Sequence, residues 1–204
     1  MKRNVWKSAF LACVVMLVAA VVVVACDSSD DAGKQYDFEK MELTFTYEVI
    51  DDVLKVADVS FSYEEANAEG VVAPVTETLT TTKWVKQMSA TTLPADFSIQ
   101  VSVTPKADVN YDKASYTLQV TRMEEFKEYQ SDGKVHWMET PDVERHSVTL
   151  PYDSSSPETF EAALKAELAL WNRTFAYVVK RDPNGGYDVE DNDYSVAGRL
   201  YRKI

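Results

Sequence analysis

The chain has 204 residues, of which 46% are apolar and 26% are charged, and its formal net charge is −12. This apolar content excludes a largely disordered chain, and the length suits one globular domain with a small appendage. The negative charge argues against a general nucleic-acid binder, because such proteins present basic surfaces to phosphates. We therefore expect no nucleic-acid partner.

The N-terminus has a basic head followed by an apolar run. Residues 1–8 contain three basic side chains and no acidic one, and residues 9–25 are uncharged and apolar. This pattern predicts a secretory signal peptide. A transmembrane helix is the alternative, because the run reaches the lower end of the roughly 17–25 residues that span a bilayer.

The run ends in Val23-Val24-Ala25-Cys26, which resembles the lipobox of bacterial lipoproteins, with Val23 in place of the commoner leucine. The resemblance implies that residues 1–25 are a lipoprotein signal peptide and that Cys26 carries lipid, which anchors the chain to a membrane. Several acyl chains would hold it stably, because each buried CH₂ contributes about 0.8 kcal/mol. Since Cys13 leaves with the signal, we expect no disulfide, thiolate metal site or cysteine nucleophile in the folded part.

Residues 26–41 are polar and acidic, which predicts a flexible tether between lipid and domain. The acidic residues Asp27, Asp30 and Asp31 resemble the surface-export signal of some Gram-negative lipoproteins. This resemblance implies an outer-membrane lipoprotein exposed at the cell surface. In other Gram-negative groups an aspartate directly after the cysteine signals inner-membrane retention, and that alternative stays open.

From residue 42 to residue 150 the chain alternates between apolar and polar residues, which predicts strands with one buried and one solvated face. Tight hairpin geometry is expected at Ser131-Asp132-Gly133-Lys134, because Asp-Gly favours such turns. Prolines fall between the predicted strands and support their boundaries. The strands are predicted at residues 43–49, 59–63, 75–86, 97–104, 116–121, 126–130, 135–139 and 146–150.

Successive strands without helices between them predict an antiparallel β-sandwich over residues 42–150. Residues 89–103, with Leu93-Pro94 before an alternating strand, resemble the corner before a late strand of fibronectin type III and immunoglobulin-like domains. The predicted fold is therefore mainly β (α+β): an antiparallel immunoglobulin-like β-sandwich with one helix and a C-terminal β-hairpin.

Residues 151–204 are expected to form that helix and hairpin, packed on the sandwich. Ser156 can cap the helix, and Pro157 and Glu158 suit its first turn. We expect the helix to end near Asn172, although residues 174–181 could continue it, and we favour a strand there. The tail, residues 194–204, alternates again. One apolar helix face is formed by Phe160, Leu164, Leu168 and Trp171.

Two features of the sequence are candidate metal sites. If residues 134–139 pair with residues 144–149, His136 and His146 point to opposite faces, so a shared metal is not expected. The acidic stretch 182–193 begins like an EF-hand loop at Asp182 and Asn184, but the following residues break that pattern. A tight turn followed by a solvated acidic loop is favoured, and a calcium site of another geometry is the alternative. We assign no catalytic, cofactor or metal residue.

Two tryptophans are candidate binding residues. Trp84 and Trp137 could stack on sugar rings or on a protein partner if they are exposed, and the alternative is that they pack in the core or under a loop. The first functional hypothesis is a non-enzymatic binding or adhesion module at the bacterial cell envelope, with a glycan or protein ligand. A structural subunit of an envelope assembly, such as a fimbrial anchor, is the second hypothesis, and a glycan or peptide hydrolase is the third.

Overall fold

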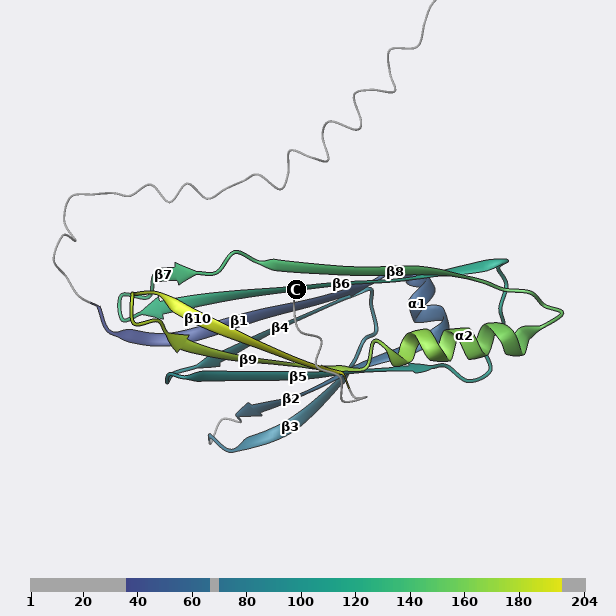
Figure 1. Cartoon of the computed structure of the whole chain (residues 1–204). Helices are drawn as coiled ribbons and strands as arrows, with labels where there is room; N and C mark the ends of the chain where they lie inside the picture. Colours follow the sequence, from purple (N-terminus) through teal and green to yellow (C-terminus); the bar gives the residue numbers. More distant parts are fainter. Residues whose placement is uncertain (1–35, 67–69, 196–204) are drawn as a thin grey trace, which may run out of the picture. The chain divides into compact units, whose positions relative to one another are not determined.

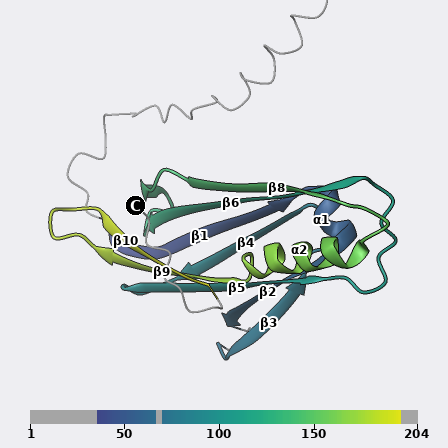
Figure 2. The same cartoon turned by 45° about the vertical axis from the view of Figure 1, so that its right-hand side comes forward.

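A computed structural model describes residues 36–66 and 70–195 of the chain. Two antiparallel sheets face each other in it, as Figures 1 and 2 show, so the predicted β-sandwich with a helix and a C-terminal hairpin is confirmed. The predicted signal peptide, Cys26 and the tail beyond residue 195 lie outside the described residues. Within the described ranges, neither helix is long and apolar enough to cross a bilayer.

The first sheet has the strand order β4-β1-β6-β7, and β8 also pairs with β6. The second sheet has the order β10-β9-β5-β2-β3. The bounds in the first sheet are β1 (Phe38–Val49), β4 (Lys83–Ala90), β6 (Ser115–Gln130), β7 (Val135–Met138) and β8 (Asp142–Pro151). Those in the second are β2 (Ala57–Ala66), β3 (Val72–Thr78), β5 (Ala95–Pro105), β9 (Arg173–Arg181) and β10 (Tyr187–Ser195). The helices are α1 (Asp51–Val56) and α2 (Pro157–Ala169).

Aromatic side chains from both sheets fill the part of the interior between β1, β2, β4 and β5. The ring of Phe61 on β2 stacks on that of Trp84 on β4, with centroids 3.9 Å apart. Tyr47 on β1 meets the same Phe61 ring edge-on, at 5.3 Å. These contacts join the two sheets directly, and they follow from the predicted alternation, because every second residue of β1 points inward.

Helix α2 lies beside the part of β5 that does not pair with β9. Phe160, Leu164 and Leu168 are buried on its inner face, as the sequence predicts. Asn172, just after the helix, accepts a hydrogen bond from the backbone N–H of Val103 at 2.7 Å and donates one to its C=O at 3.1 Å. Its side-chain amide therefore takes the place of a paired strand residue beside β5.

Several predicted boundaries are wrong. The predicted strand 75–86 is two strands in different sheets, because the chain crosses between sheets at residues 79–82. Residues 116–130 form one strand, because pairing of β6 with β1 continues through its polar middle. Helix α1 was not predicted; its acidic first turn suits a helix N-terminus, and Val53 and Val56 are buried.

The remaining corrections concern strand partners. β7 and β8 do not pair with each other, as assumed for residues 134–139 and 144–149; both pair with β6, at successive positions along it. Strand β1 starts inside the predicted tether, because the side chain of Met41 is buried. The C-terminal hairpin, predicted to pack on the sandwich, is part of its second sheet, since β9 pairs with β5.

The tight turns predicted at Ser131-Asp132-Gly133-Lys134 and at the start of residues 182–193 are both confirmed, because each joins two paired strands. Gly133 has φ 74°, the left-handed conformation that glycine adopts at low cost. The stretch 174–181 is a strand, as favoured. Acidic residues from 187 onward lie in β10 and not in a loop, because they pair with β9.

Candidate functional site

A pocket of about 240 Å³ opens between the first sheet and the junction of α2 with β9. We call it the α2–β9 pocket. Figure 2 shows the connection at which helix α2 runs directly into β9. The lining of the α2–β9 pocket combines apolar and aromatic side chains with two arginines, a glutamate and a histidine. The lining residues are Tyr47, Val120, Arg122, Glu144, His146, Leu170, Trp171, Arg173 and Phe175.

Strand register brings the charged residues of the first sheet together. Arg122 on β6 lies directly opposite Glu144 on β8, and Val120 lies opposite His146. Residues opposite each other in an antiparallel pair point to the same face, so all four face the second sheet. The edge position of β8 leaves the Glu144 side chain 48% exposed, whereas that of Arg122 is 8% exposed.

One carboxylate is held between two guanidinium groups. Arg122 Nη2 lies 3.2 Å from one oxygen of Glu144, and Arg173 Nη1 lies 3.6 Å from the other. The guanidinium of Arg122 also lies over the ring of Phe175, 4.5 Å from its centroid. Burial opposes the charge of Arg122, but the acidic groups and Tyr177 around it raise its pKa, so it stays cationic.

Glu167 on α2 positions the other wall of the pocket. Its Oε1 accepts a hydrogen bond from the indole N–H of Trp171 at 3.0 Å and lies 2.6 Å from Nε2 of His146. The two rings meet edge-on, with centroids 6.2 Å apart. A single carboxylate on the helix therefore fixes a ring from β8 and a ring from the α2–β9 junction.

Tyr47 supplies a neutral hydroxyl to this region. It is 3% exposed, and burial raises the pKa of its phenol well above the ordinary value despite the opposing charges of Arg173 and Arg122. The hydroxyl therefore stays protonated at physiological pH. Tyr47 lines the α2–β9 pocket, and it lies close enough to Arg173 and Arg122 for their charges to act on its hydroxyl.

The inner face of β6 continues beyond the pocket as a charged seam, which we define as Arg122, Glu124 and Glu128. Arg122 Nε lies 3.3 Å from Glu124. Glu128 accepts a hydrogen bond from Gln130 at 3.1 Å. Burial and the negative charge of the nearby Glu128 raise the pKa of Tyr187 on β10 to about 12. The seam faces β9 and β10 and makes this side of the interior polar.

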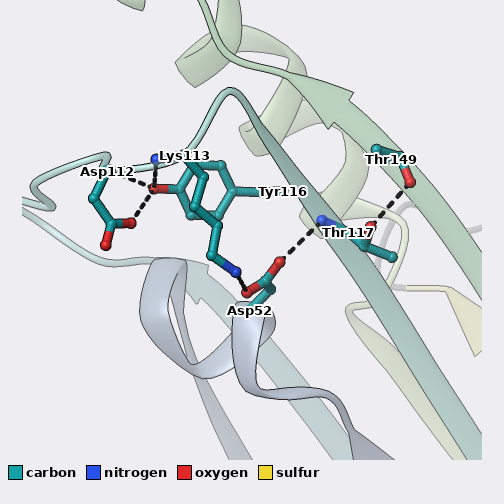
Figure 3. Close-up of polar contacts among 6 residues, drawn as sticks. All are labelled: Asp52, Asp112, Lys113, Tyr116, Thr117 and Thr149. Carbon is teal, nitrogen blue, oxygen red and sulfur yellow. Dashed lines mark hydrogen bonds and ion pairs between the residues drawn. The ribbon is translucent and has the colours of Figure 1, made fainter.

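A second polar cluster ties α1 to the start of β6 (Figure 3). Asp52 accepts hydrogen bonds from Lys113 and from the backbone N–H of Thr117. Burial opposes ionisation of Asp52, but these bonds outweigh it and lower its pKa. Tyr116 donates to Asp112 at 3.0 Å and accepts from its backbone N–H at 2.7 Å. The cluster is satisfied within itself, so we assign it a structural role in holding the β5–β6 connection.

The structure places the two candidate tryptophans differently. Trp84 is buried, stacked on Phe61, and its indole N–H donates to Glu77 at 2.7 Å. Its ring is therefore covered by Phe61, and Trp84 is not among the residues that line the α2–β9 pocket. Trp137 is half-buried beside Tyr187, with ring centroids 4.9 Å apart. Its proposed role in stacking on a ligand stays a prediction.

The candidate metal sites do not gain support. His136 lies beside Asp132 at 3.0 Å, and His146 beside Glu167, so the two histidines are separate. In the acidic stretch, Asp182 accepts a hydrogen bond from the backbone N–H of Asn184 at 2.7 Å, which stabilises the turn. Among the described residues, no group of three or more His, Cys, Asp or Glu side chains could hold a metal ion.

Sequence reasoning missed most of the pocket. It placed Trp171 on the apolar face of the helix, but it gave no role to Arg122, Glu144 or Arg173. One signal was available: the period of two that begins at Tyr116 continues to Phe126, and it puts Arg122 and Glu124 on the inward face. Charged residues at inward positions are expensive unless they are paired, so they point to a polar site.

Comparisons with known proteins add no relative. No protein-family model, no curated protein and no solved structure matches the chain. The resemblance to lipoproteins and to immunoglobulin-like domains therefore stays a prediction.

Proposed function

We propose that this chain is a lipid-anchored, non-enzymatic binding module of the bacterial cell envelope, and that the α2–β9 pocket is its ligand site. The pocket is the observation that carries the proposal. Aromatic walls, two arginines and a neutral buried hydroxyl meet there in one opening. Ligand sites commonly combine a largely apolar concave surface with a few convergent polar groups. The lipobox-like ending at Cys26 supports the membrane anchor.

The sheet edges favour this function over a structural subunit that pairs with a partner strand. Exposed edges invite pairing unless proline or charge blocks it. Each edge of the described sheets has such a residue in or beside its outer strand: Pro74 in β3, Lys83 in β4, Pro141 between β7 and β8, and Asp188 and Glu190 in β10.

The proposed site is tested by a binding screen that compares the unaltered chain with a variant in which a bulky side chain fills the pocket. The full chain in lipid nanodiscs is screened against glycan fragments, peptides and small organic molecules by calorimetry. Val120→Phe places a ring in the pocket, and Val85→Phe adds the same ring on an exposed outward position of β4. We expect at least one ligand whose affinity falls tenfold or more in Val120→Phe only. Equal binding by both variants and by the unaltered chain would contradict the proposal.

Localisation has a separate test. Intact cells are treated with protease and labelled with an antibody against the folded domain, with a periplasmic protein as the control for cell integrity. Loss of the signal places the domain on the cell surface. Persistence of the signal together with absence of antibody labelling contradicts surface exposure. In the variant Cys26→Ser, the chain is expected to lose its attachment to membranes.

A further inference from the structure

We propose that the α2–β9 pocket binds a small molecule with one ring and one carboxylate. This inference rests on the proposed function and names the ligand class of the same site. Three observations carry it: the volume of the pocket, the aromatic side chains on its walls, and a carboxylate that already lies between its two arginines.

The volume sets the size of the ligand. An engineered cavity of about 150 Å³ holds one benzene molecule. The α2–β9 pocket has about 240 Å³, which leaves room for one six-membered ring and a short polar side chain. A polymer would have to bind with a single ring inserted.

The walls suit the faces and edges of a planar ring. Phe175 and Trp171 come from β9 and its junction with α2, and Tyr47 comes from the opposite sheet. Trp171 is held in place by its hydrogen bond to Glu167. Rings prefer offset or edge-on contacts with other rings, and such contacts add to the burial of apolar area. A preformed aromatic wall lowers the entropy cost of binding.

Glu144 marks where the carboxylate of the ligand would lie. Its two oxygens approach Arg122 and Arg173, one each, at 3.2 and 3.6 Å. Planar guanidinium groups match the geometry of carboxylates. Because Glu144 is on an edge strand and half-exposed, its side chain can swing into water and leave its place to an external carboxylate. The Tyr47 hydroxyl is a further donor close to the two arginines.

The test compares three probes on the full chain in nanodiscs, with empty nanodiscs as the blank. 3-Phenylpropanoate has the ring and the carboxylate, 3-phenylpropanol has the ring alone, and acetate has the carboxylate alone. We expect 3-phenylpropanoate to bind about tenfold or more tightly than either of the others, because hydrogen bonds between a carboxylate and a guanidinium group are stronger than those between neutral groups.

Three variants separate the charge effect from loss of folding. Arg173→Gln should reduce the affinity for 3-phenylpropanoate to that for 3-phenylpropanol. Glu144→Gln should raise the affinity for 3-phenylpropanoate several-fold, because it removes the internal competitor, and misfolding cannot produce a gain. Arg181→Gln is the matched control, since it removes the same charge from β9 at an exposed position outside the pocket, and it should change nothing.

The outcomes distinguish the ligand class from the function. If 3-phenylpropanol binds as tightly as 3-phenylpropanoate, or if Glu144→Gln leaves the affinity unchanged, the assignment of the carboxylate is overturned. If no probe binds but Val120→Phe abolishes binding of another ligand, the ligand class is overturned and the proposed function stands. If no probe binds and no ligand depends on the pocket, both are overturned.

Discussion

The interior of the sandwich differs between the side formed by β1, β2, β4 and β5 and the side where β6 faces β9 and β10. On the first side, the rings of Phe61, Trp84 and Tyr47 pack across the two sheets. On the second side, the charged seam places one cation and two carboxylates between the sheets, within the same alternating pattern.

Under the proposed function, this difference separates the residues that stabilise the fold from those that bind the ligand. Burial of apolar area stabilises the first side without directional requirements. Buried charges on the second side add little net stability, because their desolvation offsets their attraction. They do fix the positions of side chains, and the α2–β9 pocket lies at the end of this side. We therefore expect the first side to dominate folding and the second side to dominate recognition.

The largest expected effect is on the apolar side. Phe61→Ala removes a fully buried ring that contacts Trp84 and Tyr47, and should lower the free energy of unfolding by about 3–5 kcal/mol. Urea unfolding followed by tryptophan fluorescence measures it. Val85→Ala, at an exposed position on β4, is the control and should change little. A loss below 1 kcal/mol for Phe61→Ala would contradict this division.

Substitutions of Arg122 and Glu124 in the charged seam should have non-additive effects on the free energy of unfolding. Arg122→Met leaves the carboxylate of Glu124 buried beside a neutral side chain, and should cost about 3 kcal/mol. Adding Glu124→Leu should restore part of that loss, because the buried charge is then removed as well. A double-mutant cycle measures the coupling. Additive losses would show that the two side chains contribute independently.

A smaller effect is expected at the end of α2. Asn172→Ala removes both hydrogen bonds to the backbone of Val103 and should lower the free energy of unfolding by about 2 kcal/mol. Hydrogen exchange at the amide of Val103 should become faster in the same variant. Asn184→Ala, in an exposed turn, is the matched control. Unchanged exchange at Val103 would mean that the side chain does not extend the sheet.

The smallest effect concerns pH. Hydrogen bonds from Trp84 and Tyr63 lower the pKa of Glu77, which bridges β3 to β4. Its stabilising contribution is therefore complete above the ordinary carboxyl value of 4.5 and is lost as the pH falls through the lower, folded-state pKa. Glu77→Gln should reduce the loss of the free energy of unfolding at acid pH by less than about 1 kcal/mol, so that stability depends less steeply on pH there. Glu65→Gln is the control, and an unchanged pH dependence in Glu77→Gln would refute the assignment.

The sequence by itself determined the local elements of this protein. The period of two in residues 43–49 and 97–104 produces strands, because side chains of a strand point alternately to two faces. The helix face from Phe160 to Leu168 and the Asp132-Gly133 turn are equally local, since they depend on residues within a few positions of each other. The basic head and apolar run at the N-terminus are also a local pattern, and its ending at Cys26 resembles a lipobox, so the signal peptide and the lipid attachment stay predictions.

Only the tertiary structure decided which strands pair and what the inward-facing charges meet. The split of residues 75–86 between two sheets, and the pairing of β7 and β8 with β6, depend on partners distant in the sequence. The same holds for the α2–β9 pocket, where Arg122, Glu144 and Arg173 come from three strands. Periodicity reports the face on which a side chain lies. The neighbour on that face follows from strand register and sheet packing, which bring residues far apart in the chain into contact.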